Sequence, residues 1–188
     1  MRLDERQNAF IRNLLRLARE AEEGRGEGRG ALADLRSGLG REPGEMARVH
    51  RHVVLYLPVK RYDDRWYYVT ATLFGAFPKH RKGYSLGAAF HSLRQKSDSM
   101  EARFVALLNA HPDDLDDHLR HIIRLLESAK HPEPLDWFRL LDDLLQWDHP
   151  EGHVKLKWAR DFYTSESKSE GNTPDADTTT NNMEERRP

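Results

Sequence analysis

Apolar residues recur along nearly the whole chain at the three- and four-residue spacing of an α-helix. The segment nearest the N-terminus shows this spacing most plainly. Its apolar stripe consists of Phe10, Leu14, Leu17 and Ala21, with Ile11, Leu15 and Ala18 beside it. The opposite side carries Arg12, Arg16 and Arg19. The pattern predicts an amphipathic helix with a basic outer face.

The sequence "GRGEGRG", residues 24–30, is expected to end this first helix, because repeated glycine raises the entropy cost of regular structure. A short helix is predicted over "ALADLRSGLG", residues 31–40, with Gly38 or Gly40 as its C-cap. The glycine-rich segment also has two Arg-Gly steps, as in RNA-binding RGG segments or a phosphate-binding loop. Its acidic neighbours favour a flexible connector.

Residues 41–62 allow two interpretations. "MARVHRHVVLYLP" reads as a helix that Pro58 stops, whereas the β-branched "HVVLYLPV" is short enough to be a buried strand. We favour the helix. Next come a largely buried helix in "DDRWYYVTATLFGAF", ending near Gly75 and Pro78, a basic loop "PKHRKG", and a helix in "SLGAAFHSLRQ".

The second half of the chain has clearer helix start signals. Asp98 and Glu101 have the spacing of a capping box before "MEARFVALLNA". Pro112 and Pro134 are each expected in the first turn of a helix, "PDDLDDHLRHIIRLLES" and "LDWFRLLDDLLQW", and Pro150 precedes a final helix. The buried stripe of the first of these is predicted to be Leu115, Leu119, Ile122 and Leu126.

Together these elements predict an all-α fold, a helical bundle of about seven to nine helices. Residues 1–164 are expected to form a single domain, with two helical lobes divided near residue 97 as the alternative organisation. Residues 165–188 are polar, rich in Thr and Asn, and without apolar periodicity, so they are predicted to be a disordered tail.

The composition of the chain limits the cellular compartments and the kinds of chemical site that we expect for this protein. The chain has no cysteine, which excludes disulfides, thiolate zinc sites and a cysteine nucleophile. No apolar run approaches the roughly 20 residues that span a bilayer, and "MRLDERQNAF" lacks the basic and apolar segments of a signal peptide. We therefore expect a cytoplasmic protein without membrane contact.

Charge is unevenly distributed although the net charge is only -1. Residues 36–96 contain 12 Lys or Arg and four Asp or Glu, a net charge of +8. Residues 97–148 contain five Lys or Arg and 12 Asp or Glu, a net charge of -7. This predicts one basic and one acidic surface, with mutual pairing of the two segments inside the fold as the alternative.

Catalytic motifs are absent from the sequence. There is no G-x-S-x-G, no G-x-x-x-x-G-K-[ST] and no H-E-x-x-H. Asp117 and His121 lie one helical turn apart and resemble a metal-ligand pair, but their face is opposite the apolar stripe and is expected in solvent. Acids in a first helical turn explain the cluster more simply, so we predict no enzyme activity, no metal and no cofactor.

The last predicted helix, "VKLKWARDFYT", separates two chemical faces. Val154, Trp158 and Phe162 share an apolar stripe that is expected to be buried, and Lys157 and Arg160 form an outward basic stripe. The four tryptophans, Trp66, Trp137, Trp147 and Trp158, all lie in apolar stripes. Core packing is therefore favoured over stacking on nucleic-acid bases for at least three of them.

Five segments together resemble a known family. "ALADLRSGLG", "SLGAAFHSLRQ" with "EARFVALLNA", "HLRHIIRLL", "LDWFRLLDDLLQW" and "WARDFY" occur in the order expected for CasB, the small subunit of the type I-E CRISPR complex Cascade. The resemblance runs from about Ala31 to Tyr163.

This resemblance implies an all-α, non-catalytic subunit of a guide-RNA complex in antiviral defence. The implied partners are the Cascade backbone and large subunits, a second copy of the chain, the crRNA–target DNA hybrid and the displaced DNA strand. The implied role is to bind the target and displaced strands and stabilise the R-loop. A helical adaptor that joins protein subunits without touching nucleic acid is the alternative.

Nine basic residues are predicted to contact nucleic acid. The resemblance and its motif positions give Arg36, Arg94, Arg120, Lys157 and Arg160. Arg65 is added from its place before the aromatic helix and from local charge. Arg41, Arg81 and Lys82 are added on charge and loop position. Arg103 of "EARF" is expected instead to be structural and to pair with an acid.

Overall fold

The fold is that of a computed structural model, which describes residues 3–58, 64–94 and 99–164. Nine α-helices occur in these ranges, and no β-strand does. They are α1 (Glu5–Glu22), α2 (Gly28–Ser37), α3 (Ala47–Val53), α4 (Asp64–Ala76), α5 (Leu86–Arg94), α6 (Ser99–Leu108), α7 (Leu115–Glu127), α8 (Trp137–Leu145) and α9 (His153–Thr164). Three short 3-10 turns are η1 (Pro43–Glu45), η2 (Val54–Tyr56) and η4 (Pro112–Asp114). The predicted all-α fold is confirmed.

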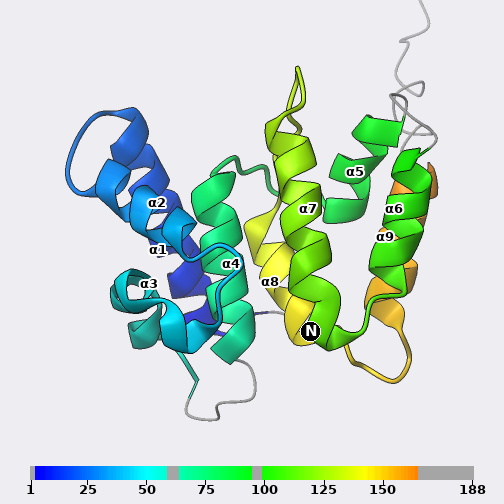
Figure 1. Ribbon diagram of the computed structural model, residues 1–188, viewed down its shortest axis with the longest axis horizontal. Coiled ribbons are helices and arrows are strands. Elements are labelled where there is room, and N and C mark those ends of the chain that lie inside the picture. The colour runs from blue at the N-terminus through cyan, green and yellow to red at the C-terminus, as the bar shows by residue number, and fades with distance from the viewer. Residues whose placement is uncertain (1–2, 59–63, 95–98, 165–188) are drawn as a thin grey trace, which may run out of the picture.

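Helix α4 is the central element of the molecule. Every residue from Trp66 to Ala76 is buried, so this helix has no wet face. On one side it packs against α2 and α3, and on the other against α7 and α8. Helices α5, α6 and α9 lie beyond α7 at the far end of the long axis (Figure 1). A helix that is apolar all round is stable only when neighbours cover it completely.

The core is continuous from one end of the molecule to the other. It includes all four tryptophans, each at most 9% exposed, which confirms the packing role predicted for them. At the α5, α6 and α9 end, Phe90, Phe104 and Phe162 stack on one another, with ring centroids of Phe104 and Phe162 4.0 Å apart. The predicted stripes of the last two long helices, from Leu115 to Leu126 and from Val154 to Phe162, are both buried.

Three predicted helix starts are wrong by about three residues. Helix α2 begins at Gly28, inside the glycine-rich segment. Pro112 opens a 3-10 turn, and the α-helix starts only at Leu115. Pro134 precedes α8, whose N-cap is Asp136, because the Asp136 carboxylate accepts hydrogen bonds from the backbone N–H groups of Phe138 and Arg139. The N-cap side chain satisfies backbone N–H groups of the first turn, which a preceding proline cannot do.

The ambiguous segment after residue 41 is helical where the structure describes it. Helix α3 ends at Val53 and continues as η2 to Tyr56, so the helix prediction is confirmed and the strand alternative is wrong for residues 47–58. The capping box at Asp98, the lobe boundary near residue 97 and the predicted tail at 165–188 lie outside the described residues. No helix in the described ranges is long and apolar enough to cross a membrane.

Helices α1 and α2 cross at Gly28, which explains why α2 begins inside the glycine-rich segment. A Cβ at this position would lie within 3.0 Å of backbone atoms of Leu17, Glu20 and Ala21. Two residues along the same helix, Gly30 has no atom within 4 Å of the corresponding position. Only the first glycine is therefore required by the packing of the two helices.

A buried carboxylate joins α8 to α9. Asp143 is only 3% exposed at its side chain and accepts hydrogen bonds from Lys157 Nζ and Trp158 Nε1, each at 2.6 Å. A buried charge is tolerated when it is paired and hydrogen-bonded, as here. The predicted outward position of Lys157 is therefore only partly right, because its ammonium group turns back onto α8.

We predict that Gly28→Ala lowers the free energy of unfolding by at least about 2 kcal/mol, because the added methyl group meets backbone that cannot rotate away. Gly30→Ala is the matched control and should raise stability by about 0.5–1 kcal/mol, the usual gain from replacing glycine within a helix. Urea denaturation followed by circular dichroism measures both. A Gly28→Ala protein as stable as the wild type would contradict this account of the crossing.

We predict that Asp143→Ala costs about 3–5 kcal/mol of stability, because it leaves the buried Trp158 N–H and the Lys157 ammonium without their acceptor. Asp148→Ala removes an exposed acid just beyond the same helix and should change stability by no more than about 0.5 kcal/mol. The two variants are compared by chemical denaturation. Equal losses would show that the buried carboxylate does not hold α9 in place.

Candidate nucleic-acid interface

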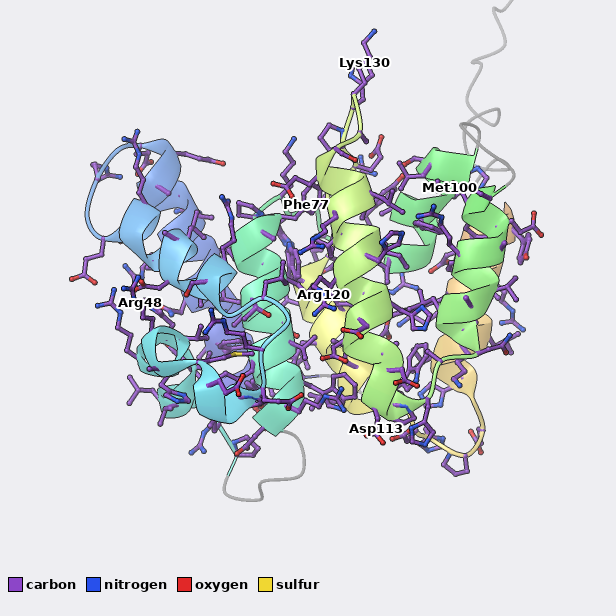
Figure 2. All side chains as sticks on the ribbon, in the orientation of Figure 1. Arg48, Phe77, Met100, Asp113, Arg120 and Lys130 are labelled. Atoms are coloured by element: carbon purple, nitrogen blue, oxygen red, sulfur yellow. The ribbon has the colours of Figure 1, made fainter. Side chains whose placement is uncertain are left out.

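Four arginines surround the connection between α2 and α3, and we call them the α2–α7 basic cluster. They are Arg36, Arg41, Arg48 and Arg120. Arg41 and Arg48 line one hollow at the C-terminal end of α2, and Arg41 and Arg120 line a smaller one between this connection and α7. Figure 2 labels Arg48 near α3 at the left edge of the molecule and Arg120 on α7 near its centre.

Two glycines fix the arginines of this cluster. Gly40 has φ +79°, a left-handed conformation that favours glycine, and the Arg120 guanidinium occupies the space where a Cβ would project. Arg36 donates a hydrogen bond from Nε to the carbonyl oxygen of Gly75 at the end of α4, at 3.2 Å. Arg36, Arg41 and Arg48 remain exposed, and Arg120 is 25% exposed at its side chain.

Acids lie beside this cluster and reduce its net charge unevenly. Asp117 forms an ion pair with Arg120, and Glu45 and Asp116 line the two hollows. Within the described residues, no ion pair involves Arg36, Arg41 or Arg48. These three exposed guanidinium groups therefore carry the free positive charge of the cluster.

Arg65, predicted as a contact residue, lies at the start of α4 and links it to α7. Its Nη2 donates to the Asp113 carbonyl oxygen at 2.7 Å and to the Asp116 carboxylate at 2.8 Å, and Nη1 lies 3.4 Å from the Asp113 carboxylate. The side chain is 28% exposed and lies 5.4 Å from the Trp66 ring. Its charge is therefore compensated within the fold, as the alternative interpretation of the charge pattern expects.

The loop at residues 78–83 holds two further predicted residues. Arg81 stacks on the Tyr84 ring at 3.6 Å and pairs with Glu133 at 3.4 Å, while its side chain stays half exposed. Lys82 is exposed and lines the rim of a hollow of about 540 Å³ between α1 and α8. Arg12, which is not among the nine predicted contact residues, lines the same hollow.

The wall of this hollow includes both aromatic and acidic side chains. Phe138 and His80 meet edge to face, with ring centroids 5.7 Å apart. Burial raises the pKa of Asp142, and the neighbouring charge of Asp143 acts in the same direction. The hollow therefore combines cations with the two acids Asp136 and Asp142, so it is less basic than the α2–α7 basic cluster.

The remaining predicted residues belong to α5 and α9. Arg94 is the last residue of α5, and its side chain lies outside the described residues. Arg160 is exposed, whereas Lys157 is held by Asp143 as described above. Because α2 and α9 lie at opposite ends of the long axis, the structure does not gather the nine residues into one patch (Figure 1). Seven of them divide among the α2–α7 basic cluster, the 78–83 loop and α9, while Arg65 lies at the start of α4 and Arg94 at the end of α5.

The histidine and aspartate group on α7 makes no inward-facing metal site in the described structure. Asp117 turns to Arg120, and His121 contacts the guanidinium of Arg103. Burial and then the positive charge of Arg103 lower the pKa of His121. We expected Arg103 to pair with an acid. That prediction is wrong within the described residues, where Arg103 contacts the imidazole of His121. Arg48 was not among the predicted contact residues, although the basic excess of residues 36–96 already included it.

Comparisons with known proteins identify the fold and the family. The sequence profile of the family described as CRISPR-associated protein Cse2 matches residues 31–163. A CRISPR-associated protein Cse2 from Thermus thermophilus is 35% identical over 137 residues, which are 71% of this chain and 78% of that protein.

Solved structures agree with this match. The crystal structure of a Cse2-family protein from Thermus thermophilus superposes with a TM-score of 0.71 at 33% identity, over 84% of this chain and 97% of that one. CasB from M. ruber gives a TM-score of 0.65 at 31% identity, over 88% and 97%. A chain of a CRISPR RNA-guided surveillance complex has the same fold, with a TM-score of 0.66 at 24% identity over 84% and 91%. The resemblance seen in the sequence is confirmed, and this chain belongs to the CRISPR-associated Cse2 family, also called CasB.

Proposed function

We propose that this chain is a non-catalytic small subunit of a crRNA-guided CRISPR surveillance complex of the Cascade type. Its place there would be beside the backbone and large subunits, together with a second copy of itself. Family membership supports this role, as does the fold shared with a chain of a solved surveillance complex. The chain would act in the cytoplasm by binding target DNA and the displaced strand, stabilising the R-loop in antiviral defence.

The observation that carries the nucleic-acid role is the set of exposed guanidinium groups in the α2–α7 basic cluster. Arg36, Arg41 and Arg48 have no ion pair among the described residues, so their charge is available to phosphate. Guanidinium groups bind phosphate oxygens through paired N–H donors and read no base sequence. A subunit that must accept any target needs contacts of this kind.

A few such contacts suffice for the proposed role. Replacing a DNA duplex by an RNA–DNA hybrid is nearly balanced in free energy, so protein contacts to the backbone of the strands can shift the equilibrium towards the open form. Each neutralised phosphate also releases bound counterions, which makes the gain dependent on salt. The chain would therefore stabilise the opened target without cleaving it.

The alternative function, that of a protein adaptor, is supported by ion pairs between the basic segment, residues 36–96, and the acidic segment, residues 97–148. Arg65 bonds to Asp113 and Asp116, and Arg81 pairs with Glu133, so part of the basic excess is neutralised inside the fold. If the other cations serve only to dock protein subunits, changing them will alter assembly and leave the strands unaffected. Measurements of strand binding and of assembly separate these two roles.

We predict that Arg36→Glu, Arg41→Glu and Arg48→Glu, introduced singly into the reconstituted complex, each weaken target DNA binding. Each lost phosphate contact should lower the slope of log affinity against log salt by about one unit. Lys130→Glu is the control, because Lys130 projects from the turn after α7, away from Arg48 and Arg120 (Figure 2). Fluorescence anisotropy over a salt series measures affinity and slope. Cluster variants that match the control in both would refute the assignment of this surface.

We predict that omitting this chain leaves the rest of the guide-RNA complex assembled but weakens target affinity and closes the displaced strand. Permanganate reactivity of unpaired thymines in the displaced strand reports opening, and size-exclusion chromatography reports assembly. Adding the chain back should restore both affinity and reactivity. If omission disrupts assembly while opening by the remaining intact complexes is unchanged, the adaptor function takes the place of the proposed one.

A further inference from the structure

The turn between α8 and α9 brings together three side chains that the proposed function does not use. His149, Glu151 and His153 each offer one candidate ligand atom, and these atoms all lie within 4.8 Å of one another. The two imidazole rings meet edge to face, with centroids 4.6 Å apart. His149 and Glu151 are exposed, and His153 is half-buried as the first residue of α9.

The backbone of this turn explains why alternate residues converge. Gly152 adopts φ +59°, a left-handed conformation, and its N–H donates to the His149 carbonyl oxygen at 2.8 Å. Its own carbonyl oxygen accepts from the Leu156 N–H, which begins the hydrogen bonding of α9. The chain reverses direction at Gly152, and this brings the side chain of His153 close to those of His149 and Glu151.

Gln146, at the end of α8, orients one of the imidazoles. Its side-chain nitrogen donates to the Asp142 carbonyl oxygen at 3.0 Å and to the Asp142 carboxylate at 2.7 Å. These bonds leave the amide oxygen facing His153 Nε2, at 3.2 Å. A proton held on Nε2 places the lone pair of a neutral imidazole on Nδ1. Outer partners that fix a histidine tautomer in this way are a regular feature of metal sites.

We propose that His149, Glu151 and His153 form a binding site for a divalent transition metal ion of the Zn²⁺ type. Two imidazoles and a carboxylate are a ligand set that Zn²⁺ accepts, with a fourth position left to water. In a tetrahedral site with zinc–ligand bonds of about 2.0–2.1 Å, the ligand atoms lie about 3.3–3.5 Å apart. The three candidate ligand atoms must therefore approach one another by roughly an ångström. Rotation of the exposed His149 and Glu151 side chains accomplishes this.

The charges around the turn are compatible with a cation. The neighbouring Asp148 is exposed and adds negative charge, whereas Lys155, the first cation along α9, lies over the Trp147 ring at 5.0 Å. His149 also accepts a long hydrogen bond from the Glu151 N–H, at 3.4 Å, which a metal can replace at little cost. A bound ion would join the end of α8 to the start of α9.

Isothermal titration of the full chain with ZnCl₂ tests the proposal. We expect one stoichiometric site, at least 10-fold weaker in His149→Ala and in His153→Ala, and about 10-fold weaker in Gln146→Ala. His131→Ala removes an exposed histidine from another turn and is the matched control, with unchanged affinity. Mg²⁺ should not compete, since it prefers an all-oxygen shell. The zinc-dependent rise in melting temperature should disappear in the same two histidine variants.

Several results would overturn the proposal. One is wild-type zinc affinity no greater than that of the His149→Ala, His153→Ala double variant. Another is an equal loss in His131→Ala, which would mean that scattered surface histidines account for the binding. Circular dichroism of each variant without zinc verifies that it folds, so that lost affinity reflects the ligands themselves. Because the isolated chain is used, the result is independent of whether it binds DNA.

Discussion

Burial of α4 from Trp66 to Ala76 is the constraint on which the rest of the fold depends. A helix with no polar face has to be enclosed, and here α2 and α3 cover one side while α7 and α8 cover the other. The two ends of the molecule therefore share one hydrophobic core instead of two. The α5, α6 and α9 end is connected through α7 and is consolidated by its own stack of three phenylalanines.

The same helix also determines where the basic side chains lie. Gly75, near its C-terminal end, allows α2 to approach so closely that a Cβ there would collide with Leu35 and with the Arg36 backbone. This approach brings Arg36 to the Gly75 carbonyl oxygen. At its other end, Arg65 ties α4 to η4 and α7. Packing of the core and presentation of charge are thus two results of one helix–helix contact.

Helix positions could be predicted from sequence because a buried stripe repeats every turn, as from Leu115 to Leu126. The first residues of helices could not be predicted in the same way. The hydrogen bonds by which Asp136 caps α8 cannot be inferred from the position of Pro134. Helix α2 extends back to Gly28 because α1 crosses it there. The excess of Lys and Arg in residues 36–96 could be counted in the sequence, but the distribution of these side chains over the folded surface could not be predicted from it. Lys157 finds its partner on another helix, and helical periodicity contains no information about such pairs.

The hydrogen bond between Arg36 Nε and Gly75 also constrains which residues position 36 can accept. The bond occupies one edge of the guanidinium plane and fixes its direction, and the terminal Nη groups form no hydrogen bond within the described residues. The three N–H donors of lysine all leave one nitrogen, so an ammonium that binds the carbonyl has to stay beside it and cannot present a separate, planar pair of donors outward. Replacing Arg36 by lysine would therefore keep the positive charge but lose the geometry. The arginine is anchored through Nε, and its two Nη groups stay available to another acceptor.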